Sequence, residues 1–174
     1  MFKIGDCVSY RAEGVCRISD IRKESFGAAD EGATYYILTP VNDPKSVLFV
    51  PVENDRLVSM MRTLLSATEI GALCASLREE RMDWIVENRL RSNFFREVLS
   101  EGERGRLVVL LNTVTERIEM QIASGKKALS TDTGAQSRAA QLLFEEFSYT
   151  TDLASIRDVI PLLRGEIALK DKTE

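Results

Sequence analysis

The spacing of apolar positions changes near residue 62. Before that point, β-branched and aromatic residues come in short runs separated by turn residues, a pattern typical of short antiparallel strands. Such a sheet suits a small, bent, barrel-like module that does not close completely, so we expect an unpaired edge. The predicted strands span residues 8–10, 15–21, 34–39, 47–50 and 56–60, with a loop over residues 27–32.

After residue 62 the spacing becomes helical. Ser66-Ala67-Thr68-Glu69 reads as a capping box, in which the Ser hydroxyl and the Glu carboxylate satisfy the first amides of a helix. Further helices are predicted to begin near Asp83, Ser100, Ser130 and Asp152, and Pro161 is expected to kink or split the last one. The apolar stripe of the helix from Asp83 would be Val86, Leu90, Phe94 and Val98, and that of the next helix would run from Leu107 to Ile122.

These patterns predict an α+β protein with two domains. A five-stranded antiparallel β module occupies residues 1–62, and a bundle of about five α-helices occupies residues 63–174. The chain carries 23 Lys and Arg against 27 Asp and Glu, a net charge of −4. A protein that coats nucleic acid without sequence preference needs an excess of positive charge to displace counterions, so that class is excluded.

The sequence contains no histidine, which removes the commonest general base and every Ser-His or Cys-His nucleophile. Cys7, Cys16 and Cys74 form no C-x-x-C pair, so we interpret them as small buried side chains and expect no metal or other cofactor. The glycines form no phosphate-binding loop. We therefore predict a non-enzymatic protein with no small-molecule substrate. The sequence shows no apolar h-region and no apolar run of membrane-spanning length, so we expect a cytoplasmic protein that makes no membrane contact. We also expect a monomer.

Trp84 is the single tryptophan of the chain. On a helix beginning near Asp83 it would lie well off the apolar stripe, with Asn88 and Arg91 on its own face and Arg89 on the adjoining side. An exposed indole beside these groups could insert into a minor groove while guanidinium groups contact phosphates. The alternative is that Trp84 packs between the domains and that the arginines pair with neighbouring acids.

The segment Val47-Leu48-Phe49-Val50-Pro51 is the second candidate contact. It is apolar on both faces, so one face would fill the module and the other, with Phe49 outward, could receive a partner strand. The alternative is a central strand that is buried on both sides. Arg22 and Lys23 are the local excess of positive charge in the module, and they either meet an acidic partner or are simply solvated.

The arrangement resembles the CarD-like transcription regulators. The resemblance is carried by Phe2-Lys3-Ile4-Gly5-Asp6-x-Val8-x-Tyr10, Gly14-Val15, Tyr35-Tyr36-Ile37-Leu38 and Val50-Pro51-Val52-Glu53-Asn54. In the helical half it continues with Trp84 and Arg89, with Leu99-Ser100-Glu101-Gly102, and with Leu163-x-Gly165-Glu166-Ile167-Ala168-Leu169. The N-terminal part is shared with transcription-repair coupling factors, which also carry a helicase half that this chain lacks.

The resemblance implies a Tudor-like domain that binds the β-subunit lobe of RNA polymerase, and a helical domain that contacts promoter DNA. The family's tryptophan, matched by Trp84, wedges into the minor groove and slows closure of the melted region, while the basic residue matched by Arg89 steadies the backbone. We thus predict polymerase contacts at Arg22, Lys23, Val47 and Phe49. The predicted DNA contacts are Trp84, Asn88, Arg89 and Arg91.

Three places depart from the family's pattern. Arg11-Ala12-Glu13-Gly14 stands where the family usually reads Pro-x-His-Gly. Phe49 stands where some members carry an arginine that meets polymerase, and Glu24 stands near the other basic contact. These departures predict recognition by apolar strand pairing more than by charge. Two alternatives stay open: an adaptor whose helical domain binds another protein instead of DNA, and an enzyme that works without histidine, which would need a deep pocket with converging polar groups.

Overall fold

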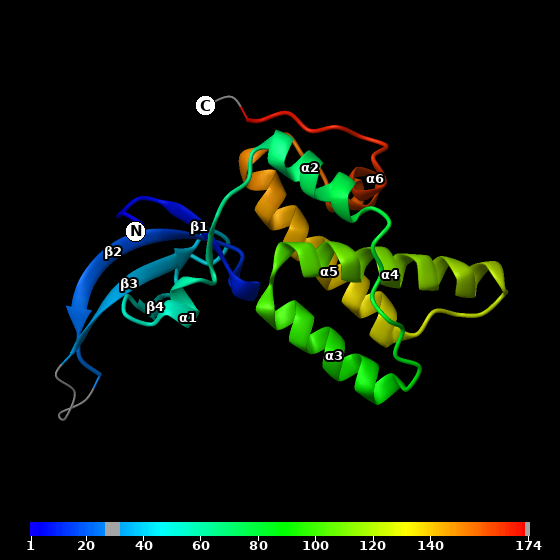
Figure 1. Ribbon diagram of the computed structural model, residues 1–174, viewed down its shortest axis with the longest axis horizontal. Helices are drawn as coiled ribbons and strands as arrows, with labels where there is room; N and C mark the ends of the chain where they lie inside the picture. The colour runs from blue at the N-terminus through cyan, green and yellow to red at the C-terminus, as the bar shows by residue number, and fades with distance from the viewer. Residues whose placement is uncertain (27–31, 173–174) are drawn as a thin grey trace. The chain divides into compact units, whose positions relative to one another are not determined.

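One antiparallel sheet forms the first unit of the chain, Met1–Leu64. The computed structural model describes residues 1–26 and 32–172, so most of the loop predicted at residues 27–32 lies outside the described residues. The sheet has the strand order β4-β3-β2-β1-β5, which leaves β4 and β5 at its edges, as predicted for a sheet that does not close (Figure 1). The strands are β1 (Cys7–Tyr10), β2 (Val15–Glu24), β3 (Ala33–Pro40), β4 (Leu48–Pro51) and β5 (Met61–Thr63).

Alternation along these strands divides the sheet into two faces. Tyr36 and Leu38 of β3 point into the core of the unit. The alternating residues of the same strand, Tyr35 and Ile37, lie on the opposite face. A bulge in β2 between Ile18 and Asp20 shifts the register with β3. The buried core consists of Val8, Tyr10, Cys16, Ile18, Tyr36, Leu38, Val50 and Met61.

The strand predicted at residues 56–60 is wrong. Asn54 accepts a hydrogen bond from the Leu57 amide and begins a single helical turn, α1 (Asp55–Val58), and strand β5 follows it. Leu57 and Val58 pack against the sheet's core from this turn. A run of four residues with two apolar positions fits a strand or a helical turn equally well, so the N-cap decides between them.

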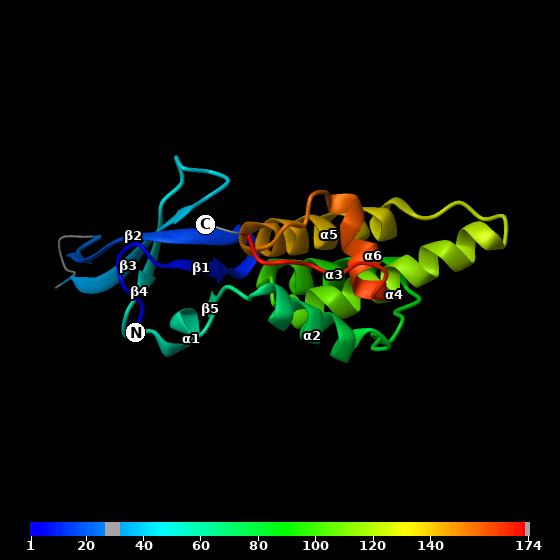
Figure 2. The same cartoon turned by 90° about the horizontal axis from the view of Figure 1, so that it is seen from above.

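Within residues 65–172, the described part of the second unit (Leu65–Glu174), the structure has five α-helices, so the α+β class is confirmed. Figures 1 and 2 show the C-terminal end of α4 projecting past α3 and α6. The core is lined mainly by apolar side chains of α4 and α5, including the fully buried Leu110, Leu111 and Phe147. The helices are α2 (Ala67–Leu77), α3 (Asn88–Glu101), α4 (Arg104–Ala123), α5 (Ser130–Thr150) and α6 (Val159–Arg164), with short 3₁₀ turns at Arg11–Glu13 and Ile156–Asp158.

The helix boundaries follow from the capping residues. The capping box at Ser66 and Glu69 is present as predicted. The helix predicted from Asp83 begins instead at Asn88, because Glu87 caps it, and it runs on to Gly102, which adopts the left-handed conformation at φ 60°. The next helix therefore begins at Arg104 and not near Ser100, with Glu103 as its cap.

The apolar stripe predicted for α3 is also wrong in part. Val86 is 85% exposed and Leu90 is 58% exposed, whereas Arg91, Phe95 and Val98 form the buried face. Val86 precedes the helix, and Arg91 can occupy the buried face because its guanidinium is paired with an acid of α5. On α4 the predicted stripe ends early, and Ile122 is 62% exposed on the projecting end.

The long C-terminal helix predicted from Asp152 is broken up. Asp152 pairs with Lys170 through backbone and side-chain hydrogen bonds instead of capping a helix. Helix α6 ends at Gly165, where φ is +74°. Pro161 lies in the first turn of α6, where an amide has no partner within the helix, so it neither kinks nor splits that helix.

Candidate functional site

Trp84 lies in the irregular segment between α2 and α3, not at the start of a helix. This segment passes along α4 (Figure 1), where the Met82 amide donates a hydrogen bond to the Thr113 hydroxyl at 2.9 Å. The indole is half-buried and packs against the helical core, with its ring centroid 6.3 Å from that of Phe95. Part of the ring therefore stays accessible, and the rest is fixed by the core.

Two guanidinium groups lie close to the indole ring. The Cζ atom of Arg91 is 4.6 Å from the ring centroid, and the Cζ atom of Arg117 is 5.2 Å from it. Both distances fall within the range of a cation–π contact. Arg117 belongs to α4, far from Trp84 in the sequence, and no periodicity or motif signals this contact. The contact between Arg117 and Trp84 arises only because the segment after α2 runs along α4 in the folded protein.

Arg91 is removed from the set of predicted DNA contacts. It is 3% exposed, and its Nε donates to a carboxylate oxygen of Asp132, which is fully buried, at 2.9 Å. Its remaining donors reach the carbonyl oxygens of Ile85 and Val86 and the amide oxygen of Asn88. A guanidinium engaged in this way orders the chain around Trp84 and has no surface to offer to a phosphate.

The other predicted DNA contacts lie at the surface. Asn88 is exposed, although its side-chain oxygen accepts from Arg91 at 3.0 Å. Arg89 is exposed, and its side chain has no hydrogen bond or ion pair with any other described residue. Trp84, Asn88 and Arg89 thus stay predicted contacts, brought together at the start of α3.

Two of the acidic groups near the indole are engaged within the chain. Both carboxylate oxygens of Glu87 accept backbone amides, from Arg89 at 2.9 Å and from Leu90 at 3.0 Å. The Asp132 carboxylate is paired with the Arg91 guanidinium. The exposed charges that remain are the carboxylates of Asp83 and Glu87 and the guanidinium groups of Arg89 and Arg117, so the balance near Trp84 is close to neutral.

Three aromatic rings gather on the second face of the β-sheet, at its β4 edge. Phe26, Tyr35 and Phe49 form a triangle with centroid separations of 5.1–6.1 Å and nearly perpendicular planes. Such edge-to-face contacts are favourable between aromatic rings. Phe26 is 63% exposed and Phe49 is 37% exposed. Phe49 thus points outward from an edge strand, and the alternative of a central strand buried on both sides is wrong.

The other predicted polymerase contacts lie on β2 or just before β4. Val47 is 49% exposed just before β4, and Lys23 is exposed on β2. Arg22 is exposed but bonded to the carboxylates of Glu24 at 2.5 Å and Asp20 at 3.0 Å. The Glu24 carboxylate, with that of Asp20, holds the pKa of the Arg22 guanidinium above its ordinary value. The positive charge predicted at Arg22 is therefore offset by its neighbours.

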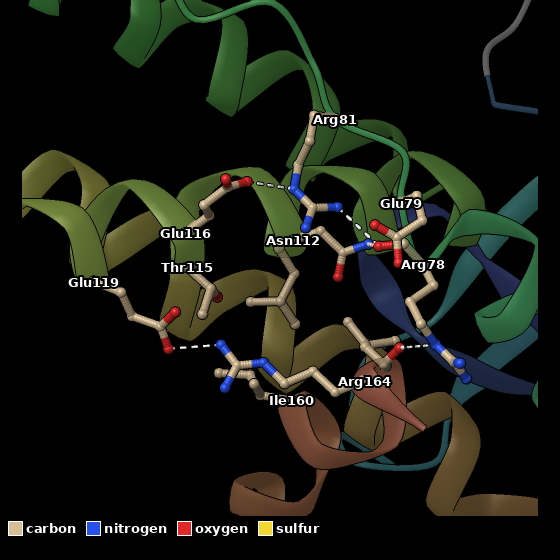
Figure 3. Close-up of a pocket in the computed structure, with 11 residues that line it drawn as sticks. Arg78, Glu79, Arg81, Asn112, Thr115, Glu116, Glu119, Ile160 and Arg164 are labelled. Atoms are coloured by element: carbon tan, nitrogen blue, oxygen red, sulfur yellow. Dashed lines mark hydrogen bonds and ion pairs between the residues drawn. The ribbon is translucent and has the colours of Figure 1, made fainter. Parts of the chain in front are cut away.

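A polar cavity of about 380 Å³ lies between α4, α6 and the segment that follows α2 (Figure 3). Its charged groups are paired across it: Arg81 bonds to Glu116 and Arg164 to Glu119, each at 2.6 Å. Arg78 follows the last residue of α2, and its Nε donates to the Leu163 carbonyl oxygen of α6 at 3.4 Å. These contacts hold α6 and the segment after α2 against α4, so the charged residues of the cavity wall stabilise the packing of the helical unit.

The three cysteines are free thiols. Burial raises the pKa of Cys16 to about 12 and that of Cys74 to about 11, so both are neutral and unreactive at physiological pH. Within residues 1–26 and 32–172, no group of three or more Cys, Asp or Glu side chains could hold a metal ion. In the same residues, no helix is long and apolar enough to cross a membrane.

Comparison with known families assigns the first unit. Residues 2–64 match the family model described as the CarD-like/TRCF RID domain, a range that coincides with the β-sheet unit. The resemblance predicted from the sequence is thereby confirmed for this unit. No curated protein matches the chain.

Proposed function

From the membership of residues 2–64 in the CarD-like/TRCF family of RNA polymerase-interacting domains, we propose that this protein is a transcription regulator. Its sheet unit binds the β-subunit lobe of RNA polymerase, and its helical unit contacts promoter DNA and changes the lifetime of the open complex. The family match is the observation that carries the proposal.

The β4 edge is the proposed docking element. An edge strand offers unpaired amide and carbonyl groups to an incoming strand, and side chains beside it give that pairing its specificity. Phe26, Tyr35 and Phe49 stand next to this edge, while the charge of Arg22 is offset by Asp20 and Glu24. These features favour an apolar match with the lobe over one based on charge.

The proposed DNA contact is the surface around Trp84. Its indole edge would wedge into the minor groove at the upstream end of the melted region, with Arg89 on the backbone. The net charge of −4 predicts weak binding to DNA in solution. Tethering through the sheet unit compensates, because polymerase holds the helical unit at a high effective concentration next to the promoter.

The test compares Trp84→Ala with Trp84→Phe and the wild-type protein. We expect both variants to bind the β-lobe fragment normally, and Trp84→Ala to lose the effect on open-complex lifetime while Trp84→Phe keeps part of it. Met120→Ala removes another exposed apolar side chain of the unit and serves as the control. Unchanged lifetimes with Trp84→Ala in a protein that folds and binds the lobe would count against the wedge.

One observation favours a second candidate, an adaptor whose helical unit binds a protein. Val86 and Leu90 are both exposed where the chain enters α3, and exposed apolar side chains of this size often mark protein contacts. The adaptor predicts no footprint on promoter DNA even when polymerase is present. A footprint upstream of the melted region that depends on Trp84 would instead support the regulator.

A further inference from the structure

Arg117, like Arg89, is an exposed arginine of the helical unit that is not bonded to a carboxylate of the described residues. In the helical unit Arg81, Arg91, Arg104, Arg106 and Arg164 are each bonded to a carboxylate. Arg117 is exposed, and within residues 65–172 its side chain has no hydrogen bond or ion pair and lies against the Trp84 ring. Its positive charge is therefore held at the surface by a contact that leaves its donors available.

The acids next to Arg117 on its own helix are already engaged. Glu116 is bonded to Arg81, and Glu119 is bonded to Arg164. Both of these pairs lie on the wall of the cavity between α4, α6 and the segment after α2. Residue 117 follows Glu116 by about 100° around the helix, which turns Arg117 away from that wall and toward the segment that carries Trp84.

We infer that Arg117 and Trp84 form one two-point contact for DNA, in which the guanidinium of Arg117 binds a backbone phosphate beside the base or base step that the indole touches. The inference rests on the proposed function, because it assumes that the Trp84 surface meets DNA. An arginine fits a phosphate through two parallel N–H donors. The flat guanidinium can keep its contact with the indole while its outer edge turns to the phosphate.

Charge complementarity favours DNA as the occupant. Arg117 is an exposed cation, and the acids next to it on its helix and the buried Asp132 are each paired with another arginine, while Asp83 and Glu87 stay exposed before α3. An acidic protein segment would bind the same cations. The crosslinking experiment below distinguishes this outcome, because it identifies whether residue 117 touches DNA or protein.

The first experiment tests the Arg117–Trp84 contact without DNA. Because Trp84 is the single tryptophan, quenching of the protein's tryptophan fluorescence reports on this site. Arg117→Ala should increase quenching by neutral acrylamide, since the ring loses a cover, and should lower quenching by iodide relative to acrylamide, since a cation is lost. Arg157→Ala, which removes an exposed arginine elsewhere in the unit, should change neither. Equal quenching in the two variants would overturn the contact.

The second experiment uses the full chain with polymerase and a promoter. Arg117→Ala should shorten the extended open-complex lifetime about tenfold, the loss expected for one charge-assisted contact. The dependence of this lifetime effect on salt should fall by about 0.7–0.9 in the log–log slope, which is one phosphate contact. Arg117→Lys should keep the salt slope but lose part of the lifetime effect, and Arg157→Ala should match the wild type.

A direct readout identifies the occupant. A photoreactive residue introduced as Arg117→p-benzoylphenylalanine should crosslink to promoter DNA near the upstream edge of the melted region, whereas the same substitution at Arg157 should not. If Arg117→Ala matches Arg157→Ala while Trp84→Ala loses its effect, the inference is wrong and the proposed function stands. If Trp84→Ala and Arg117→Ala both behave as wild type with lobe binding intact, or if residue 117 crosslinks to protein alone, the DNA contact itself is wrong.

Discussion

Arg91 and Asp132 form a buried ion pair that fixes the chain around Trp84. The guanidinium donates to both carboxylate oxygens, at 2.9 and 3.4 Å, and the two side chains are 3% and 0% exposed. The same guanidinium lies 4.6 Å from the Trp84 ring centroid and holds the carbonyl groups of Ile85 and Val86. The position of the indole is therefore set from α5, through one arginine of α3.

Breaking this pair should destabilise the helical unit strongly. Asp132→Ala leaves the Arg91 guanidinium buried without its countercharge, which costs about 3–5 kcal/mol. We expect this loss in urea unfolding followed by far-UV circular dichroism, together with a shift of the Trp84 emission in the folded state. Glu97→Ala removes an exposed carboxylate from α3 and should cost less than about 0.5 kcal/mol.

A double variant of Arg91 and Asp132 separates the effect of buried charge from the effect of packing. Replacing both members, Arg91→Met with Asp132→Leu, should recover most of the stability lost in Asp132→Ala, because no charge then remains buried. If Asp132→Ala were no less stable than Glu97→Ala, the pair would have no part in holding the segment.

Two glycines should respond to alanine with opposite signs. Gly134 lies inside α5 and an added Cβ would meet nothing within 4 Å, so Gly134→Ala should stabilise the unit by about 0.5–1 kcal/mol. Gly165 has φ +74°, and an added Cβ would press against the Arg78 guanidinium. Gly165→Ala should therefore cost about 1–2 kcal/mol. Thermal unfolding of both variants measures the difference, and the same sign for both would contradict this account.

The extent to which the sequence predicts this protein differs between its parts. Strand alternation and the Ser66 capping box place most elements, because those signals are local. The orientation of α3 is not local. The stripe Val86–Leu90–Phe94 satisfies helical periodicity, but α3 begins only at Asn88 and buries Arg91 against Asp132, while Val86 and Leu90 are exposed.

The candidate contacts show the same limit. Phe49 is found from its position on an edge strand, whereas the ring triangle with Phe26 depends on where the chain after β2 lies. Arg117 is not found at all, because its contact with Trp84 joins α4 to an irregular segment. Tertiary contacts between separate elements leave no periodic signal in the sequence.

The buried thiol of Cys74 should make stability fall at high pH. Its pKa is raised by burial from 9.0 to about 11 in the folded protein. The unfolded chain therefore loses this proton first, so the stabilisation is fully present below pH 9 and is lost as the pH rises toward 11. Urea midpoints followed by Trp84 fluorescence under reducing conditions should fall across this range, and less steeply for Cys74→Ala. Parallel curves for the two proteins would show that this thiol does not contribute.

The aromatic triangle predicts how the polymerase lobe is recognised. Phe49 carries one ring of the triangle on the β4 edge, so a charge at this position would be buried without a partner if the lobe presents an apolar surface. Both Phe49→Glu and Phe49→Arg should then weaken binding to the lobe fragment by at least about tenfold, since an unpaired buried charge costs more than about 1.4 kcal/mol. Phe49→Leu should retain most of the affinity. Val41→Glu places the same charge on a partly exposed residue beyond β3 and should leave the affinity unchanged. An acidic lobe surface would give the opposite result for one variant: Phe49→Arg would bind more tightly than the wild type, and recognition would be by charge after all.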